Sequence, residues 1–261
     1  MAFTSRLAII SGGIGGIGSA VGKLLLSQGA KLALLYAPFE EDSVASVLEE
    51  VYGSSSHPDI ATYPCDITSP QSVQDAFDAI ASDATAFPSL LINSAGYVNL
   101  SPLEDTTPED SLRHYMINLY GPTLTGQAFA RLYFKARAGQ ANPPGARIVN
   151  IASQAAHVAL DKHGAYCASK AGLVGLTKCQ ANEWGSRGIT ANTVSPGPVW
   201  TALGKKAWAD DKVREEYQKA VPTGQFAEPE EVASIVSFLC QDSSKNINGD
   251  DVRLDGGYTA R

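Results

Sequence analysis

The stretch AIISGGIGGIGSAVG, residues 8–22, decides the fold, because it joins an apolar strand candidate to a helix candidate through a glycine-rich turn. Such a turn lets backbone N–H groups and a helix N-terminus approach a pyrophosphate. Two glycine patterns overlap in it: Gly13, Gly15 and Gly18 fit G-x-G-x-x-G, whereas Gly12, Gly16 and Gly18 fit G-x-x-x-G-x-G. A tight turn without a ligand can have the same composition, so the stretch alone leaves these interpretations open.

The rest of the chain alternates between short apolar runs and longer stretches with helical periodicity. The helix candidate 18–30 follows the first run and places Leu24 and Leu25 to face a sheet. Strand candidates lie at 6–10, 31–36, 59–64, 89–93, 146–151 and 189–194. This alternation predicts βαβ units and a parallel sheet covered on both faces. We expect the α/β class, with one Rossmann-type doubly wound domain over residues 1–261.

Composition narrows the function classes. The net charge is −7 and no Lys/Arg-rich block is present, which argues against nucleic acid as a partner. No apolar run reaches the roughly 20 residues of a membrane span, and the first residues reach glycines before a signal-peptide core forms, so we expect a cytoplasmic protein that does not bind membranes. The cysteines are not spaced as metal ligands or as a disulfide framework, so no metal is expected; they are Cys65, Cys167, Cys179 and Cys240.

The stretch YCASK, residues 166–170, carries a candidate for acid/base chemistry. Tyr166 and Lys170 are four residues apart within the helix candidate 165–184, so their side chains share one helix face. A Lys ammonium beside a phenol stabilises the phenolate and lowers a pKa that is ordinarily about 10. Tyr166 could then exchange protons near neutrality. The same pair also occurs by chance on solvated helices, so the spacing alone does not decide its role.

In motif order the chain resembles the short-chain dehydrogenase/reductase superfamily over nearly its whole length. Its TGxxxGxG motif is similar to Ser11-Gly12 through Gly16-Ile17-Gly18, with Ser in place of Thr, and its YxxxK motif is similar to residues 166–170. The resemblance favours the second glycine frame. It implies hydride transfer between a nicotinamide and a carbonyl carbon, which interconverts a secondary alcohol and a ketone.

The resemblance also implies roles for individual residues. Tyr166 would be the acid/base, and Ser153 would hydrogen-bond the substrate oxygen. Lys170 would bind the nicotinamide ribose and lower the pKa of Tyr166, while Asn118 would organise a proton-relay water. Cofactor contacts would come from the glycine turn, Tyr166 and Lys170, and from Tyr36, Asp66, Ile67, Asn93, Ala95, Gly96, Pro196, Gly197, Val199 and Thr201.

The end of the second strand bears on the choice between NAD(H) and NADP(H). An Asp at position 36 would indicate NAD, and an Arg at position 37 or a basic residue at position 15 would indicate NADP. The chain has Tyr36, Ala37 and Gly15 there, and the first acid arrives at Glu40. Family members with Tyr at this place commonly use NADP(H) with help from the following residues, but residues 37–39 supply no cation. NAD(H) is therefore favoured, unless a Lys or Arg comes from elsewhere.

The resemblance places polar and aromatic residues above the nicotinamide, which favours a small polyhydroxylated or ring-bearing substrate. A lid is expected at 201–224, with Trp208 either packing within it or meeting substrate. The substrate candidates are Ser153, Gln154, Tyr97, Val98, His157, His163 and Trp200. The chain looks similar to polyol and sugar dehydrogenases, and the family usually forms homotetramers.

Two other functions stay open. A 3-oxoacyl carrier-protein reductase, or a related secondary-metabolite ketoreductase, would share the chemistry, and Arg131, Lys135 and Arg137 could dock an acidic carrier. However, Asn182 stands where carrier-protein reductases usually have a second Arg. A non-catalytic nucleotide sensor would share only the fold, and the complete set of four catalytic residues argues against it.

Overall fold

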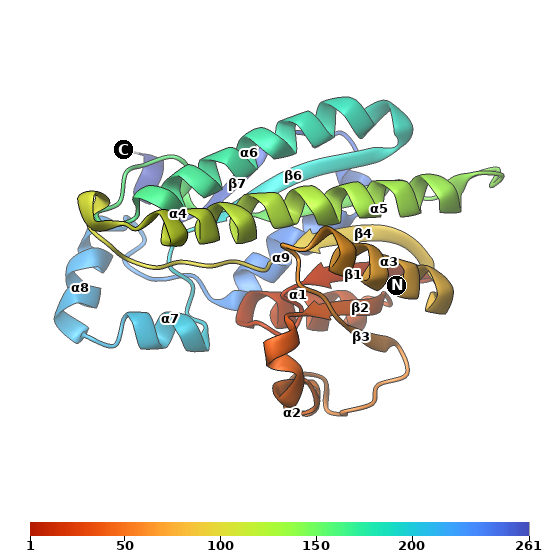
Figure 1. The fold of residues 1–261 in the computed structure, drawn as a ribbon, viewed down its shortest axis with the longest axis horizontal. Helices are drawn as coiled ribbons and strands as arrows, with labels where there is room; N and C mark the ends of the chain where they lie inside the picture. The colour runs from red at the N-terminus through yellow and green to blue at the C-terminus, as the bar shows by residue number, and fades with distance from the viewer. Residues whose placement is uncertain (261) are drawn as a thin grey trace.

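The computed structural model describes residues 1–260, and its centre is a seven-stranded parallel sheet (Figure 1). The strand order is β3-β2-β1-β4-β5-β6-β7. Their bounds are β1 Arg6–Ser11, β2 Lys31–Tyr36, β3 Ile60–Pro64, β4 Phe87–Asn93, β5 Ala146–Ile151, β6 Ile189–Pro196 and β7 Asp251–Leu254. The order reverses between β1 and β4, and in open α/β sheets this switch point is where ligands bind. The predicted fold class is confirmed.

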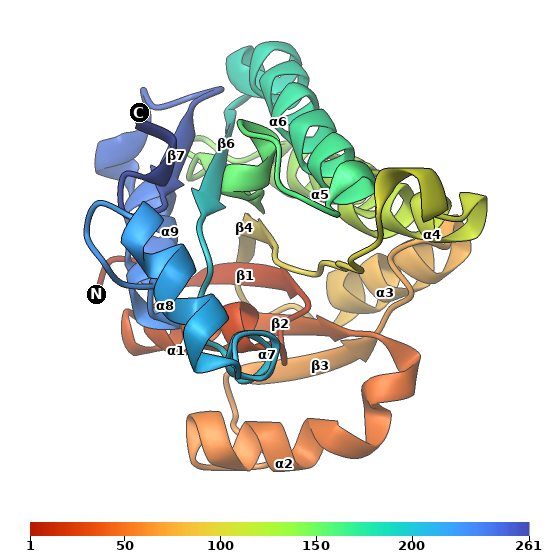
Figure 2. The same cartoon turned by 90° about the vertical axis from the view of Figure 1, so that its left-hand side faces the viewer.

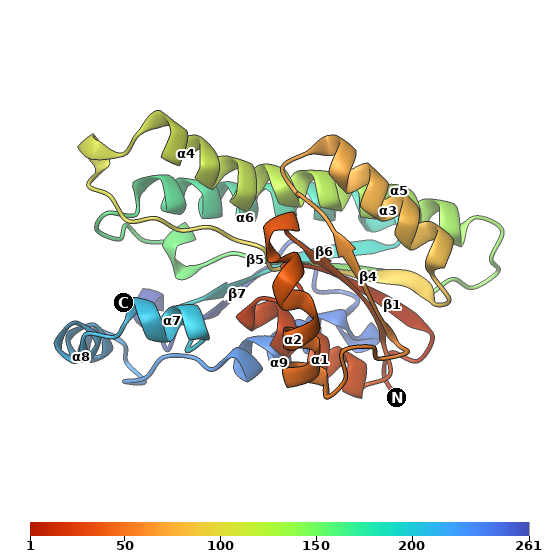
Figure 3. The same cartoon turned by 60° about the horizontal axis from the view of Figure 1, so that its bottom comes forward.

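Helices cover both faces of the sheet (Figure 3). Their bounds are α1 Gly16–Ser27, α2 Glu41–Tyr52, α3 Pro70–Asp83, α4 Pro108–Tyr115, α5 Gly121–Arg137, α6 Gly164–Trp184, α7 Ala202–Ala207, α8 Asp211–Ala220 and α9 Pro229–Cys240. A π-helical segment, Met116–Tyr120, joins α4 to α5. One core lies between the sheet and α3, α5 and α6, and the other lies against α1, α2 and α9.

The sequence explains why the sheet is buried on both sides. Every residue of β1, β5 and β6 is buried, as near-continuous apolar runs predict for parallel strands. In α1, Leu25 is fully buried in the second core and Leu24 packs against it, as expected. The six predicted strands are all present. We did not predict β7 from periodicity, because its four residues are only partly buried and alternate weakly.

The expected lid region contains two short helices, α7 and α8, which lie beyond the carboxyl ends of the strands (Figure 2). Within residues 1–260, no helix has the length and apolar character to cross a membrane. The same residues contain no His/Cys/Asp/Glu cluster that could hold a metal ion. All four cysteines are free thiols.

Candidate active site

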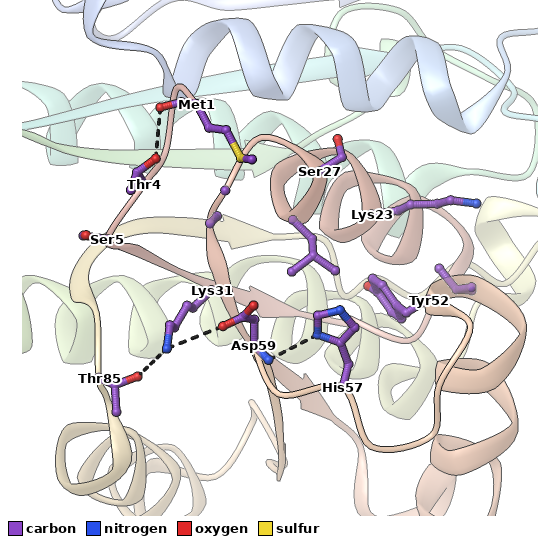
Figure 4. Close-up of a pocket in the computed structure, with 14 residues that line it drawn as sticks. Met1, Thr4, Ser5, Lys23, Ser27, Lys31, Tyr52, His57, Asp59 and Thr85 are labelled. Carbon is purple, nitrogen blue, oxygen red and sulfur yellow. Dashed lines mark hydrogen bonds and ion pairs between the residues drawn. The ribbon is translucent and has the colours of Figure 1, made fainter.

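A cavity of about 1190 Å³ opens at the carboxyl ends of the strands. One end is lined by Tyr36, Glu40 and Asp66, and the other by Ser153 and Tyr166, with the glycine turn between them. A second cavity, of about 670 Å³, lies at the amino ends of the strands (Figure 4). There Lys31 already bonds Thr85 and pairs with Asp59 at 3.5 Å. The larger cavity, at the switch point, is therefore the candidate active site.

The glycine turn forms the floor of this cavity, and close approach requires glycine at several places, among them Gly12, Gly16 and Gly18. Gly12 has φ +64°, and a Cβ there would lie 2.8 Å from the Ala95 backbone. A Cβ at Gly16 would lie 2.7 Å from the Thr201 side chain, and one at Gly18 would strike the carbonyl oxygen of Gly12. Helix α1 begins at Gly16 without a side-chain cap, so its first N–H groups can face an anion. The geometry favours the Gly12, Gly16, Gly18 frame.

Behind the turn, buried polar side chains tie three strands to two helices. Asn93 donates to Asn150 at 2.8 Å and accepts from Thr125 at 2.7 Å, while Ser11 approaches the same Asn93 oxygen at 3.4 Å. Asn150 in turn donates to Thr177 of α6 at 2.8 Å. Ser11 and Asn93, which we expected among the cofactor contacts, thus lie behind the cavity wall and hold it in place. The other expected cofactor contacts line the cavity, except Gly18 at the turn, whose closeness to Gly12 keeps the turn tight.

Three of the four predicted catalytic residues meet at one end of the cavity: Ser153, Tyr166 and Lys170. Lys170 is 5% exposed, donates from Nζ to the Ile151 carbonyl at 2.8 Å, and lies 5.8 Å from the centre of the Tyr166 ring. Asn118 is fully buried in the π-helical segment. Its side chain accepts from Tyr97 N at 2.8 Å and donates to the Tyr97 carbonyl at 2.8 Å. Asn118 thereby fixes the loop that lines the wall of the cavity.

Burial controls the protonation of this end. It raises the pKa of Tyr166, and a hydrogen bond with Ser153 only partly opposes that effect. It lowers the pKa of Lys170 to about 8. The prediction that the Tyr166 pKa is lowered is therefore wrong for this structure, because loss of hydration penalises the phenolate more than its neighbours stabilise it. Tyr166 is held as a neutral phenol, the form that can donate a proton.

His114 is a buried neighbour of Tyr166 that sequence reasoning missed. Its ring centre lies 6.3 Å from that of Tyr166 in an edge-on contact. Its Nε2 accepts from Asn99 N at 3.1 Å, and its Nδ1 lies 2.8 Å from the Asp110 carbonyl. These bonds fit the neutral tautomer with the proton on Nδ1. The available signal was its place four residues before Asn118, the same spacing that links Tyr166 and Lys170.

The predicted substrate residues divide into two groups. Ser153, Tyr97 and Val98 line the cavity. Outside its lining, His157 pairs with Asp251 of β7 at 2.8 Å, and His163 faces the Asp161 carbonyl at 2.6 Å. The hydrogen-bonding partners of both imidazoles thus lie outside the cavity, but the ring of His163 also packs edge-on against Tyr166, with its centre 6.0 Å from that of Tyr166.

Gln154 and Trp200 also lie outside the described lining of the cavity. Gln154 is 3% exposed and hydrogen-bonds Tyr217 of α8, while Trp200 packs 5.7 Å from Phe226. Trp208 packs on Tyr217 at 4.8 Å and on Phe226 at 5.1 Å, and Tyr217 stacks on Tyr258 at 5.2 Å. Residues of the expected lid thus pack in an aromatic cluster, and the bond from Gln154, the residue after Ser153, connects this cluster to the catalytic end of the cavity.

Comparison with known proteins agrees with this geometry. A family model described as enoyl-(acyl carrier protein) reductase matches residues 12–259. The chain belongs to the short-chain dehydrogenase/reductase family. As a member of that family it is an oxidoreductase that interconverts a secondary alcohol and a ketone.

Among curated relatives, the D-threitol dehydrogenase of Mycolicibacterium smegmatis is 40% identical over 98% of this chain and 94% of its own length. The NAD-dependent glycerol dehydrogenase of Listeria innocua is 36% identical over 99% of this chain and 95% of its own length. A solved short-chain dehydrogenase/reductase from Serratia marcescens is 28% identical, has a TM-score of 0.84, and covers 99% of this chain and 100% of its own. The family uses NAD(H) or NADP(H).

Proposed function

We propose that this short-chain dehydrogenase/reductase is an NAD(H)-dependent polyol dehydrogenase and ketose reductase, with Tyr166 as its acid/base. One observation carries the proposal: Ser153, Tyr166 and Lys170 converge on one end of a cavity whose other end is lined by Tyr36, Asp66 and Ile67, where we place the adenosine. The similarity to threitol and glycerol dehydrogenases supports a small polyhydroxylated substrate.

The residues fit a nicotinamide nucleotide. The glycine turn forms a cradle that any Cβ would fill, beside the uncapped N-terminus of α1, which suits a pyrophosphate. Asp66 and Ile67 line the adenosine end, and Lys170 lies where it would reach ribose hydroxyls at the other end. When bound, the nicotinamide supplies or accepts the hydride.

Residues of this chain would stabilise the charge on the substrate oxygen and supply the proton that it takes up. In ketone reduction, the Ser153 hydroxyl would donate to the substrate oxygen and stabilise the charge that develops on it. Tyr166 would donate the proton that this oxygen requires, because its raised pKa keeps the phenol protonated. Lys170, held by the Ile151 carbonyl, would keep a cation near the Tyr166 oxygen as it loses its proton. In alcohol oxidation, the same groups would work in reverse.

The surrounding elements would complete the active site. We propose that residues 201–224 form a lid over the substrate, with the Gln154–Tyr217 bond linking its position to Ser153. The other predicted substrate residues would affect the substrate indirectly, by supporting the residues that line the cavity. They are His157, His163, Trp200 and Gln154. Oligomerisation as a homotetramer, which the family resemblance implies, belongs to the same proposal.

Initial rates test the proposal. We would measure oxidation of polyols and reduction of ketoses with NAD(H) and with NADP(H), using acetoacetyl thioesters as the carrier-reductase comparison. Polyol and ketose turnover, lost in Tyr166→Phe with the fold retained, is the expected result. Thioester turnover alone, or a fully active Tyr166→Phe variant, would refute the assignment.

A further inference from the structure

The adenosine end of the cavity contains an arrangement of carboxylates that the usual strand-end motif does not describe. The usual acid at the end of β2 is replaced by Tyr36, and the nearest acids come from the turn Pro38–Glu40 and the start of α2. The Tyr36 phenol donates to Glu41 Oε2 at 2.5 Å. The Ala37 N–H donates to Glu40 Oε2 at 2.8 Å. The Tyr36 phenol and the Ala37 N–H are therefore both already engaged as donors.

A proton count shows what this end can offer a ligand. A phenol has one proton, so Tyr36 presents only oxygen lone pairs to the cavity while it donates to Glu41. Burial and Glu41 raise the pKa of Tyr36 to about 12, so it stays protonated. Breaking a bond to a charged carboxylate would be needed to free the donor. A ribose 2′-hydroxyl can donate to these acceptors, whereas a 2′-phosphate brings only acceptors and negative charge.

Helix α2, which follows these residues, does not stabilise the negative charge of a bound phosphate. The N-terminus of α2 has the partial positive charge that could attract an anion, but Glu41 and Asp42 already occupy its first turn. Among the described residues that line the cavity, the only cations are Arg113 and Lys170. Arg113 lies over the Tyr97 ring at 4.3 Å, and Lys170 is bonded to Ile151, so both belong to the opposite wall.

We propose that Glu40 and Glu41 are the residues that select NAD(H) over NADP(H), by engaging the donors of Tyr36 and Ala37 and placing two carboxylates beside the end of β2. The proposal rests on the proposed nucleotide site. It assigns the choice between the two nucleotides to the turn and the helix that follow β2. Glu41 acts through Tyr36, because Tyr36 lines the cavity and donates its one proton to Glu41.

Equilibrium binding tests it without turnover. NAD+ and NADP+ are titrated separately into the full chain by calorimetry, with no substrate present. We expect NADP+ to bind the unaltered protein at least about tenfold more weakly than NAD+, the size expected for a near, partly screened charge repulsion. In the double variant E40Q/E41Q, which keeps similar shape and acceptor oxygens, this ratio should fall to about threefold or less.

Two single variants are matched controls. Asp42→Asn removes one carboxylate charge, half of what the double variant removes, from the same helix turn as Glu41 without touching the strand end, so the ratio should change less than about twofold. Phe39→Ala removes an 87% exposed ring that lines the cavity, and should weaken both nucleotides alike. Circular dichroism would show that each variant is folded.

The possible results distinguish failure of the role of Glu40 and Glu41 from failure of the nucleotide site. Equal or tighter binding of NADP+ by the unaltered protein, or an unchanged ratio in the folded double variant, would overturn the role of Glu40 and Glu41 while leaving the nucleotide site intact. An equally large change in the Asp42 variant would also overturn it, since the effect would then be one of net charge. Failure of both nucleotides to bind would overturn the nucleotide site and this inference together.

Discussion

Replacing Lys170 with Met should stabilise the protein near neutral pH while abolishing its activity. Lys170 is 5% exposed, and burial lowers its pKa from 10.5 to about 8. That difference corresponds to about 3 kcal/mol of folding free energy at pH 7. Met has a similar length and no charge. Its one direct loss is the bond to the Ile151 carbonyl, which costs about 1 kcal/mol. We expect a net gain of about 2 kcal/mol at pH 7.

The pH dependence separates this cause from better packing. Because the folded-state pKa of Lys170 lies below its unfolded value, the penalty is complete below about pH 8 and disappears as the pH rises toward 10.5. Between pH 7 and pH 9.5, the stability of the unaltered protein should gain about 2 kcal/mol relative to the variant. The advantage of Lys170→Met should therefore shrink with rising pH.

Urea unfolding at pH 7.0, 8.5 and 9.5 measures the difference, with both proteins at one concentration. Lys178→Met is the matched control, because Lys178 lies on the same helix but is exposed. Its effect on stability should not vary with pH in this range. If the difference between Lys170→Met and the unaltered protein stays constant within about 0.5 kcal/mol, the burial penalty assigned to Lys170 is wrong.

Three further predictions follow from the site. Gly18→Ala should lose nucleotide binding in calorimetry, because the added Cβ strikes the Gly12 carbonyl oxygen; unchanged affinity would contradict the cradle. Because the pKa of Tyr166 is raised, log kcat/KM for alcohol oxidation should rise with pH through the neutral range, whereas a rate that falls would contradict a phenolate base. Tyr217→Phe removes the bond between α8 and Gln154 and should raise KM about threefold or more with a smaller change in kcat; an unchanged KM would show that this bond does not contribute to substrate binding.

Local patterns in the sequence predicted the parts of the site whose residues lie close together in the chain. The glycine turn is one stretch, and Tyr166 with Lys170 is one helix face, so spacing alone places each. The strands around them are apolar runs whose burial the sheet requires. These features did not reveal protonation, because the pKa of Tyr166 depends on how much water the folded chain excludes from it.

Contacts between segments that are far apart in the sequence could not be predicted from local patterns. Asn93 meets Asn150 across neighbouring strands, and His157 meets Asp251 near the end of the chain. Neither pair has a spacing that a local pattern can detect. These long-range bonds help to decide which polar residues line the cavity, and for that reason the sequence did not show that His157 and Asn93 lie outside its lining.

The two ends of the cavity are controlled by different physical effects: burial at the catalytic end and carboxylate hydrogen bonds at the adenosine end. At the catalytic end, loss of water acts on single groups, so Tyr166 keeps its proton and Lys170 holds its charge weakly. At the adenosine end, carboxylates near solvent take up the donors of Tyr36 and Ala37. A buried site can tune a proton because each group lacks water to compensate a charge, whereas these carboxylates would select a ligand through the donors that they engage. Exposing Lys170 to water would remove the burial that lowers its pKa, so its ammonium would hold its proton more firmly.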